Sequence, residues 1–89
     1  MSTRVALISI IVSNDNHISE VNALLHEAAP YIIGRMGIPY RAKDINIISV
    51  AIDAPQDVIS ALSGKIGKLD GINAKIVYSN VISSETEEK

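Results

Sequence analysis

The sequence predicts an α+β fold, a βαββαβ sandwich in which a four-stranded antiparallel sheet carries two helices on one face. Two observations predict it. The order strand, helix, strand occurs twice, in residues 4–38 and again in residues 45–78. The composition, 47% hydrophobic with no Phe or Trp, is dominated by aliphatic residues that favour sheets. Right-handed crossovers in both halves place both helices on the same side of the sheet.

The first half begins with a strand over residues 4–12 that is apolar on both faces, which is typical of a strand buried on both sides. Turn-forming residues follow, and Asn16 is the expected N-cap of a helix over residues 17–29. A weaker strand over residues 31–38 is interrupted by two glycines, and Pro39 closes it.

The second half repeats this order with a strand over residues 45–52, a helix over residues 55–69 and a strand over residues 73–78. The halves also align residue by residue, since Ser9 of the first strand matches Ser49 of the third. This repeat predicts a pseudo-symmetric sandwich in which the first and third strands are central.

Length and composition limit the possible functions. The chain is long enough for one domain, expected over residues 1–80, with a polar acidic tail over residues 81–89 that we expect to be disordered. The last five residues carry the whole net charge of −2, so the domain body is nearly neutral and has no field to attract nucleic acid. The lack of Cys excludes disulfides, thiolate metal sites and iron–sulfur clusters.

We expect a cytoplasmic protein. No apolar run approaches the roughly 20 residues that a membrane span needs, and the first residues lack the layout of a signal peptide.

The sheet face away from the helices is predicted to be open and apolar. Burying its large aliphatic side chains is worth roughly 10 to 20 kcal/mol per protomer as an upper value, whereas association costs roughly 4 to 15 kcal/mol. We therefore expect a homo-oligomer, a dimer or tetramer, although a swapped register or the tail would also cover this face. The expected interface residues are Val5, Leu7, Ser9, Ile11, Ile33, Ile45, Ile47 and Val77.

Few polar side chains suggest a binding site. His17 and His26 are nine residues apart on one helix, on opposite faces, and predict no metal site within a chain. Asn22 and His26 share a helix face beside the apolar stripe. Arg35 is expected on the open face, where it would bind an anion or pair with an acid across an interface. Asn22, His26, Arg35 and Arg41 are the candidate ligand or interface residues.

No catalytic residue and no cofactor is predicted. No Ser, His and Asp set and no carboxylate pair has a suitable geometry. The three Tyr residues lie outside the two central strands, where RNA-binding modules of this topology carry the aromatic residues on which bases stack.

Three segments of the chain resemble a known family, the small regulators of the iron-only hydrogenase system. They are residues 21–26 (VNALLH), 35–41 (RMGIPYR) and 61–67 (ALSGKIG), and the resemblance extends over about residues 4–79. It implies a ferredoxin-like, ACT-like fold, related to the ligand-binding domain of nickel-responsive repressors. Those relatives are oligomeric sensing modules, so the resemblance also implies a regulatory role in hydrogenase expression or maturation.

The chain departs from the better-known relatives at their ligand sites. It has no Cys and no ribbon–helix–helix segment, unlike the nickel repressors, and residues 13–16 lack the glycine that ACT domains commonly place after the first strand. No ligand residue is therefore carried over from them.

These observations favour a non-enzymatic ACT-like regulatory module that forms homo-oligomers and binds a small ligand or a protein partner. Two alternatives remain. One is a DNA-binding transcriptional regulator, which the nearly neutral body disfavours. The other is a dimeric ferredoxin-like enzyme, such as a monooxygenase, which would need a polar pocket between sheet and helices.

Overall fold

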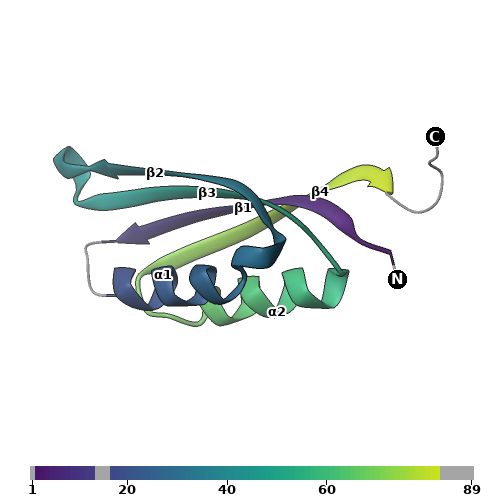
Figure 1. Ribbon diagram of the computed structural model, residues 1–89. Coiled ribbons are helices and arrows are strands. Elements are labelled where there is room, and N and C mark those ends of the chain that lie inside the picture. Colours follow the sequence, from purple (N-terminus) through teal and green to yellow (C-terminus); the bar gives the residue numbers. More distant parts are fainter. Residues whose placement is uncertain (1, 14–16, 83–89) are drawn as a thin grey trace.

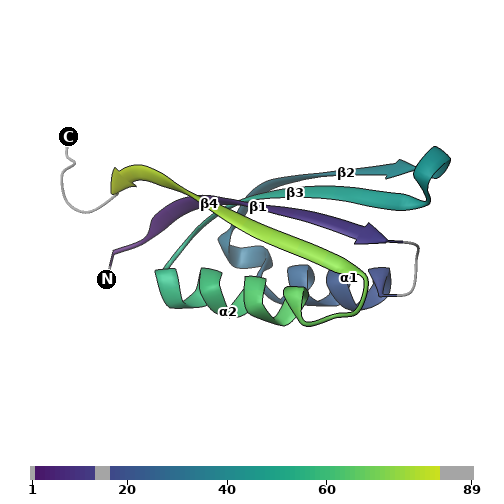
Figure 2. The same cartoon turned by 180° about the vertical axis from the view of Figure 1, so that it is seen from behind.

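The computed structural model describes residues 2–13 and 17–82 and has the predicted architecture of one sheet and one helix layer (Figure 1). Its sheet is four-stranded and entirely antiparallel, in the order β2-β3-β1-β4, so the first and third strands are central as the internal repeat predicts. Both helices lie on the same face of the sheet (Figure 2). The elements are β1 (Arg4–Ser13), α1 (Ile18–Glu27), η1 (Ala29–Tyr31), β2 (Ile32–Tyr40), η2 (Arg41–Lys43), β3 (Ile45–Ala54), α2 (Gln56–Gly67) and β4 (Ile72–Ile82).

Both helices are shorter than predicted. Helix α1 ends at Glu27 because the next residues tighten into the 3₁₀ helix η1, which contains Pro30. Helix α2 starts after Pro55, which is its N-cap rather than part of its first turn. The predicted cap Asn16 and the tail residues 83–89 lie outside the described residues.

The turn from α2 to β4 depends on a glycine. Gly71 has a φ of 75°, and its carbonyl oxygen accepts a 2.7 Å hydrogen bond from the backbone N–H of Ser13. This left-handed backbone is strained for other residue types, so Gly71 fixes the chain as it enters the last strand. Strand β4 then continues to Ile82, beyond the predicted end at Tyr78.

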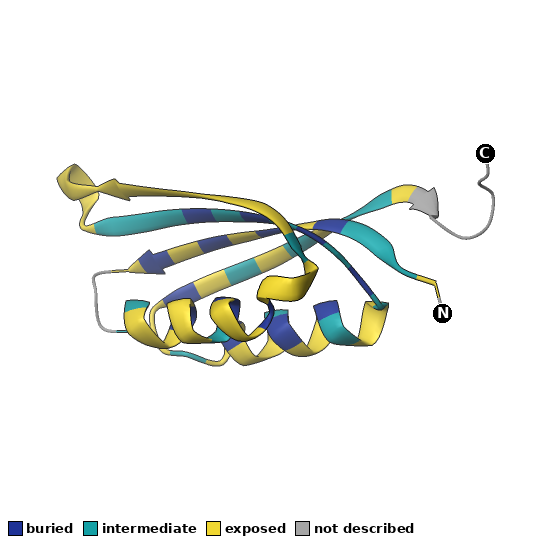
Figure 3. Ribbon diagram, viewed as in Figure 1, coloured by how far each residue is buried: buried dark blue, intermediate teal, exposed yellow. Residues whose placement is uncertain are grey.

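The hydrophobic core fills the space between the helices and the sheet. Alternate residues of β1 and β3 are buried there. Each helix contributes an apolar stripe, and its outer surface is exposed (Figure 3). The buried residues of these two strands are Ala6, Ile8, Ile10, Val12, Ile48, Val50, Ile52 and Ala54.

Strand β2 contains a β-bulge near its start. Ile32 pairs with Ile52 of β3, whereas the next paired residue, Gly34, lies opposite Ala51. Ile33 is therefore an extra residue in β2, and it is 64% exposed. Because strand side chains alternate between the two faces, one extra residue shifts every later side chain of β2 to the other face.

The bulge makes the prediction for Arg35 wrong. Arg35 pairs with the buried Val50 and lies on the helix side of the sheet, not on the open face. In its place the open face receives Met36, Ile38 and Tyr40, which pair with open-face residues of β3. The strand also runs through Pro39 rather than ending there, which an edge strand tolerates because its outer N–H groups need no partner.

The sheet face without helices, here called the open sheet face, is apolar as predicted but differs in membership. Its side chains on the edge strands remain substantially exposed, with Met36 at 50% and Val77 at 62%. Ser9 and Ser49 lie directly opposite each other near its centre. Ile33, which the sequence predicts on this face, is the bulge residue and has no partner in β3. The large apolar residues that pair across this face are Val5, Leu7, Ile11, Met36, Ile38, Tyr40, Ile45, Ile47 and Val77.

Candidate functional site

The inner side of β2 is the least covered part of the helix-facing surface. Every residue of β2 after Ile32 is exposed, which Figure 3 shows as a continuous yellow strand. After the bulge, its inward residues are Arg35, Gly37 and Pro39, none of which is a large aliphatic residue that would draw a helix onto it. Helix α1 therefore stands beside β2 without closing on it, and a groove, here called the α1–β2 groove, remains between them.

Three adjoining hollows form this groove. The first has a volume of about 370 Å³, the second about 180 Å³ and the third about 270 Å³. The first and second share Asn22 and Arg35, and the second and third share Pro39 and Asn46. The first hollow is lined by Asn22, Leu25, His26, Ala29, Ile32 and Arg35.

A hydrogen bond crosses the groove between the first and second hollows. The Nη2 atom of Arg35 donates to Oδ1 of Asn22 at 2.9 Å, which links β2 to α1. Because a guanidinium has only donors, the amide of Asn22 must turn its oxygen to Arg35 and its NH₂ group away from it. Among the described residues, the ion pair that the structure contains joins His17 to Glu20, so no carboxylate there neutralises Arg35.

The floor of the groove is apolar and its rim is polar. Leu25 is buried beneath the first hollow and Ile48 beneath the second. Gly37 widens the second hollow, since a Cβ placed on it would meet no other atom within 4 Å. An apolar floor with a few polar groups at its edge is the usual composition of a small-molecule site.

The structure brings together three of the four candidate residues. Asn22, His26 and Arg35 line the first hollow, because Asn22 and His26 lie one turn apart on α1 and the bulge turns Arg35 toward them. Arg41 does not join them. It follows β2 at the tip of the β2–β3 hairpin and lines the third hollow.

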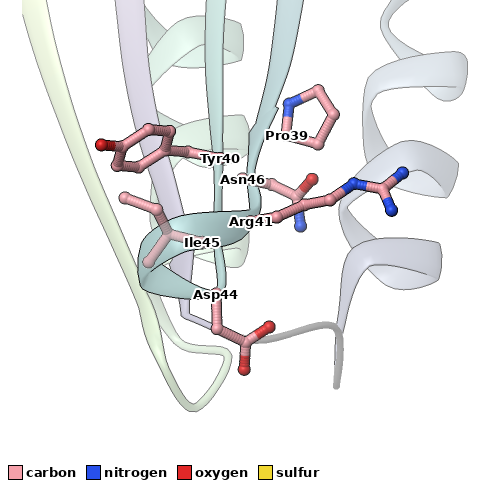
Figure 4. Close-up of a pocket in the computed structure, with 6 residues that line it drawn as sticks. All are labelled: Pro39, Tyr40, Arg41, Asp44, Ile45 and Asn46. Atoms are coloured by element: carbon pink, nitrogen blue, oxygen red, sulfur yellow. The ribbon is translucent and has the colours of Figure 1, made fainter.

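Arg41 is too far along the strand to share a small ligand with Arg35. Six extended residues span about 20 Å. Figure 4 shows Arg41 reaching to the side of Pro39 and Asn46, away from Tyr40 and Ile45. The two arginines therefore belong to opposite ends of the groove.

The two histidines, His17 and His26, lie in different places. The Nδ1 atom of His17 lies 3.4 Å from Oε2 of Glu20, while His26 lines the first hollow. In the part of the chain that the structure describes, no three His, Asp or Glu side chains converge as metal ligands.

A second polar cluster, at the opposite end of the sheet, is structural. The guanidinium of Arg4 stacks on the Tyr78 ring at 4.4 Å and donates hydrogen bonds to Gln56 Oε1 and to the Ser79 carbonyl oxygen. These contacts join β1, α2 and β4. They hold the three elements together, although among the described residues the buried Nε atom of Arg4 has no hydrogen-bond partner.

Comparison with known proteins identifies the family. A family model described as "TM1266-like: Iron-only hydrogenase system regulator, putative" matches residues 4–76. The chain belongs to the TM1266-like family. This confirms the family that the sequence motifs predict.

Solved structures agree with that assignment. The chain is 34% identical to the TM1266 protein of Thermotoga maritima, described as uncharacterized, with a TM-score of 0.83 over 85% of this chain and 96% of that chain. A formyltetrahydrofolate deformylase from Pseudomonas putida KT2440 is 13% identical, with a TM-score of 0.65 over 86% of this chain and 29% of that chain. The second likeness shows the fold alone, and the TM1266-like chain has the predicted ferredoxin-like, ACT-like fold.

Comparison with curated proteins gives no match. Within the described ranges, no helix has both the length and the apolar character that crossing a membrane requires.

Proposed function

We propose that this TM1266-like protein is a non-enzymatic regulatory module of an iron-only hydrogenase system. It acts as a homo-oligomer in the cytoplasm and binds a small ligand in the α1–β2 groove. The family description supports the regulatory role, and the open sheet face supports self-association.

The observation that carries the proposal is the apolar character of the open sheet face. Six of its large side chains are between 41 and 62% exposed. Burying the exposed part of these six side chains is worth about 5 to 9 kcal/mol per protomer, which is less than the value expected if they were fully exposed. Two protomers together gain about 10 to 18 kcal/mol, which is comparable to or above the association cost of about 4 to 15 kcal/mol. A second copy of the chain presents a matching apolar face.

The groove supports a ligand-sensing role over a purely structural one. The first hollow, at about 370 Å³, is within the lower part of the range of small-molecule sites, about 300 to 1,000 Å³. Its donors come from both a helix and an edge strand, so a ligand that binds there contacts two elements at once.

Neither alternative function gains an observation of its own. The outer surfaces of both helices are exposed, but neither the family description nor the two solved structures reported above names a DNA-binding protein. Among the described residues no polar side chain is buried between sheet and helices, so the core has no polar pocket of the kind that the enzyme alternative requires.

Deleting the gene in its native host tests the regulatory proposal. We expect the level of hydrogenase transcripts or of assembled hydrogenase to change, and the wild-type gene to restore it. A gene carrying Ile11→Glu, which places a charge on the open sheet face, should fail to restore it. Unchanged hydrogenase levels in the deletion strain would contradict the proposal.

A further inference from the structure

We propose that the first hollow of the α1–β2 groove binds a small carboxylate that carries an aliphatic group. This inference rests on the proposed function, because it names the class of ligand for the same groove. The recognising groups are Arg35, Asn22 and His26, above a floor that includes Leu25 and Ile32.

The rim of the hollow offers hydrogen-bond donors. Arg35 has five N–H donors, and the structure assigns one of its nitrogens to Asn22. Since the oxygen of Asn22 accepts that bond, its NH₂ group is the part left to bind a ligand. An imidazole such as that of His26 carries at least one N–H in either protonation state. A ligand with acceptor atoms suits this set, and one with donors only does not.

The charge of the hollow favours an anion. Among the described residues that line it, Arg35 is the only arginine or lysine, and none is an Asp or Glu. The nearest acidic lining residue of the groove is Asp44, in the third hollow at the hairpin tip. The positive charge of Arg35 therefore acts on the first hollow without a carboxylate of the described residues lining it.

The geometry favours a carboxylate over a phosphate. A guanidinium binds a planar carboxylate through two parallel hydrogen bonds, and one arginine is enough to match its single charge. A phosphate carries up to two charges and more acceptor oxygens, for which one arginine and one amide are a poor match. The apolar floor and the limited volume select a short aliphatic group on the other end of the ligand.

The bulge in β2 supports the assignment. Without the extra residue Ile33, the alternation of β2 that the sequence predicts would place Arg35 on the open sheet face, away from Asn22. Bulges often redirect a side chain at a functional site, and this one turns the only arginine of β2 toward α1.

The test is a titration of the full ¹⁵N-labelled chain with 4-methylvalerate, followed by NMR, with the uncharged 4-methylvaleramide as a matched control. We expect the acid to shift the amide signals of residues 22–35 with saturable binding, and the amide compound to bind at least about tenfold more weakly. Arg35→Gln should reduce the affinity for the acid about tenfold or more, and Arg41→Gln should leave it unchanged.

A second variant separates loss of the site from loss of the fold. Asn22→Asp places a carboxylate of the chain beside Arg35, so it should abolish acid binding while the spectrum of the folded protein is retained. Equal binding of acid and amide, tighter binding of inorganic phosphate, or full affinity in Arg35→Gln would each overturn the assignment. Sedimentation of the same samples distinguishes the two proposals. An oligomer that does not bind the acid would contradict only the proposed ligand class, whereas a monomer would contradict the proposed function.

Discussion

Arg35 Nη2 lies 2.9 Å from Asn22 Oδ1, so a single side-chain hydrogen bond joins the edge strand of the sheet to helix α1. Both residues are exposed, so solvent weakens the contribution of this bond to stability. We expect a coupling free energy of about 0.5 to 1 kcal/mol between them.

A double-mutant cycle with Asn22→Ala and Arg35→Ala measures this coupling through urea unfolding. The cycle is needed because alanine also raises the helix propensity of α1, which offsets the lost bond in the single variant. Additive effects of the two substitutions would show that the bond adds nothing to stability.

Neighbouring residues of β1 should respond differently to truncation. Ile8 is fully buried between sheet and helices, so Ile8→Ala should lower the free energy of unfolding by about 2 to 5 kcal/mol. With the proposed interface broken by Ile11→Glu in both proteins, Leu7→Ala should cost about half as much or less, because Leu7 is 46% exposed on the opposite face. Urea unfolding of both variants at one protein concentration checks this order, and equal losses would place Leu7 in a core.

Replacing each of two glycines with alanine should change the free energy of unfolding in opposite directions. Gly71→Ala forces a side chain into a left-handed backbone at φ 75°, with its Cβ 3.4 Å from the Ser13 carbonyl oxygen, and should cost about 1 to 2 kcal/mol. Gly64→Ala lies within α2, where a Cβ meets nothing within 4 Å, and should stabilise the protein by about 0.5 to 1 kcal/mol. Thermal unfolding of both variants is the measurement.

The direction of the stability change in Gly64→Ala also tests whether another chain packs on the outer surface of α2. A destabilising Gly64→Ala would mean that another chain approaches this helix closely, because the space around it within the chain is free.

A charge on the open sheet face should dissociate the proposed homo-oligomer. Ile11 lies on the central strand β1 and is 41% exposed, so Ile11→Glu would bury a carboxylate in the proposed interface. Sedimentation velocity should show a shift toward the mass of one chain. Ala23→Glu, on the exposed outer side of α1, is the matched control and should leave the assembly intact. An unchanged mass for Ile11→Glu would show that the open sheet face is not the interface.

The sequence predicted the central strands and the core correctly because their pattern is simple. Strands β1 and β3 are aliphatic over almost their whole length, and Ser9 and Ser49, which match in the repeat, pair with each other in the structure. Where each residue has a side chain and a pairing partner, alternation determines the buried face.

The error at β2 has a physical cause. Ile33 breaks the alternation, and the glycine after it carries no side chain whose polarity would reveal the change of phase. The exposed edge position gives no burial signal either. The one hint in the sequence is the doublet Ile32-Ile33 followed by Gly34, since glycine within a strand often marks a bulge.

The candidate site was therefore predicted only in part. The spacing of Asn22 and His26 on one helix face was sufficient to place them together. Arg35 joins them through the bulge, from the side of the sheet opposite to the one predicted, and Arg41 lies at the other end of the groove. The floor residue Leu25 was not predicted as part of a binding surface.

Consecutive residues of β2 belong to different surfaces: Arg35 to the groove, Met36 to the open sheet face. The strand is paired on one side only, by β3, so it is easier to displace than the central strands β1 and β3. A molecule that shifts Arg35 also shifts Met36, and a neighbouring subunit that fixes Met36 also fixes Arg35. If ligand binding changes the association constant of the subunits by some factor, then association must change the ligand affinity by the same factor.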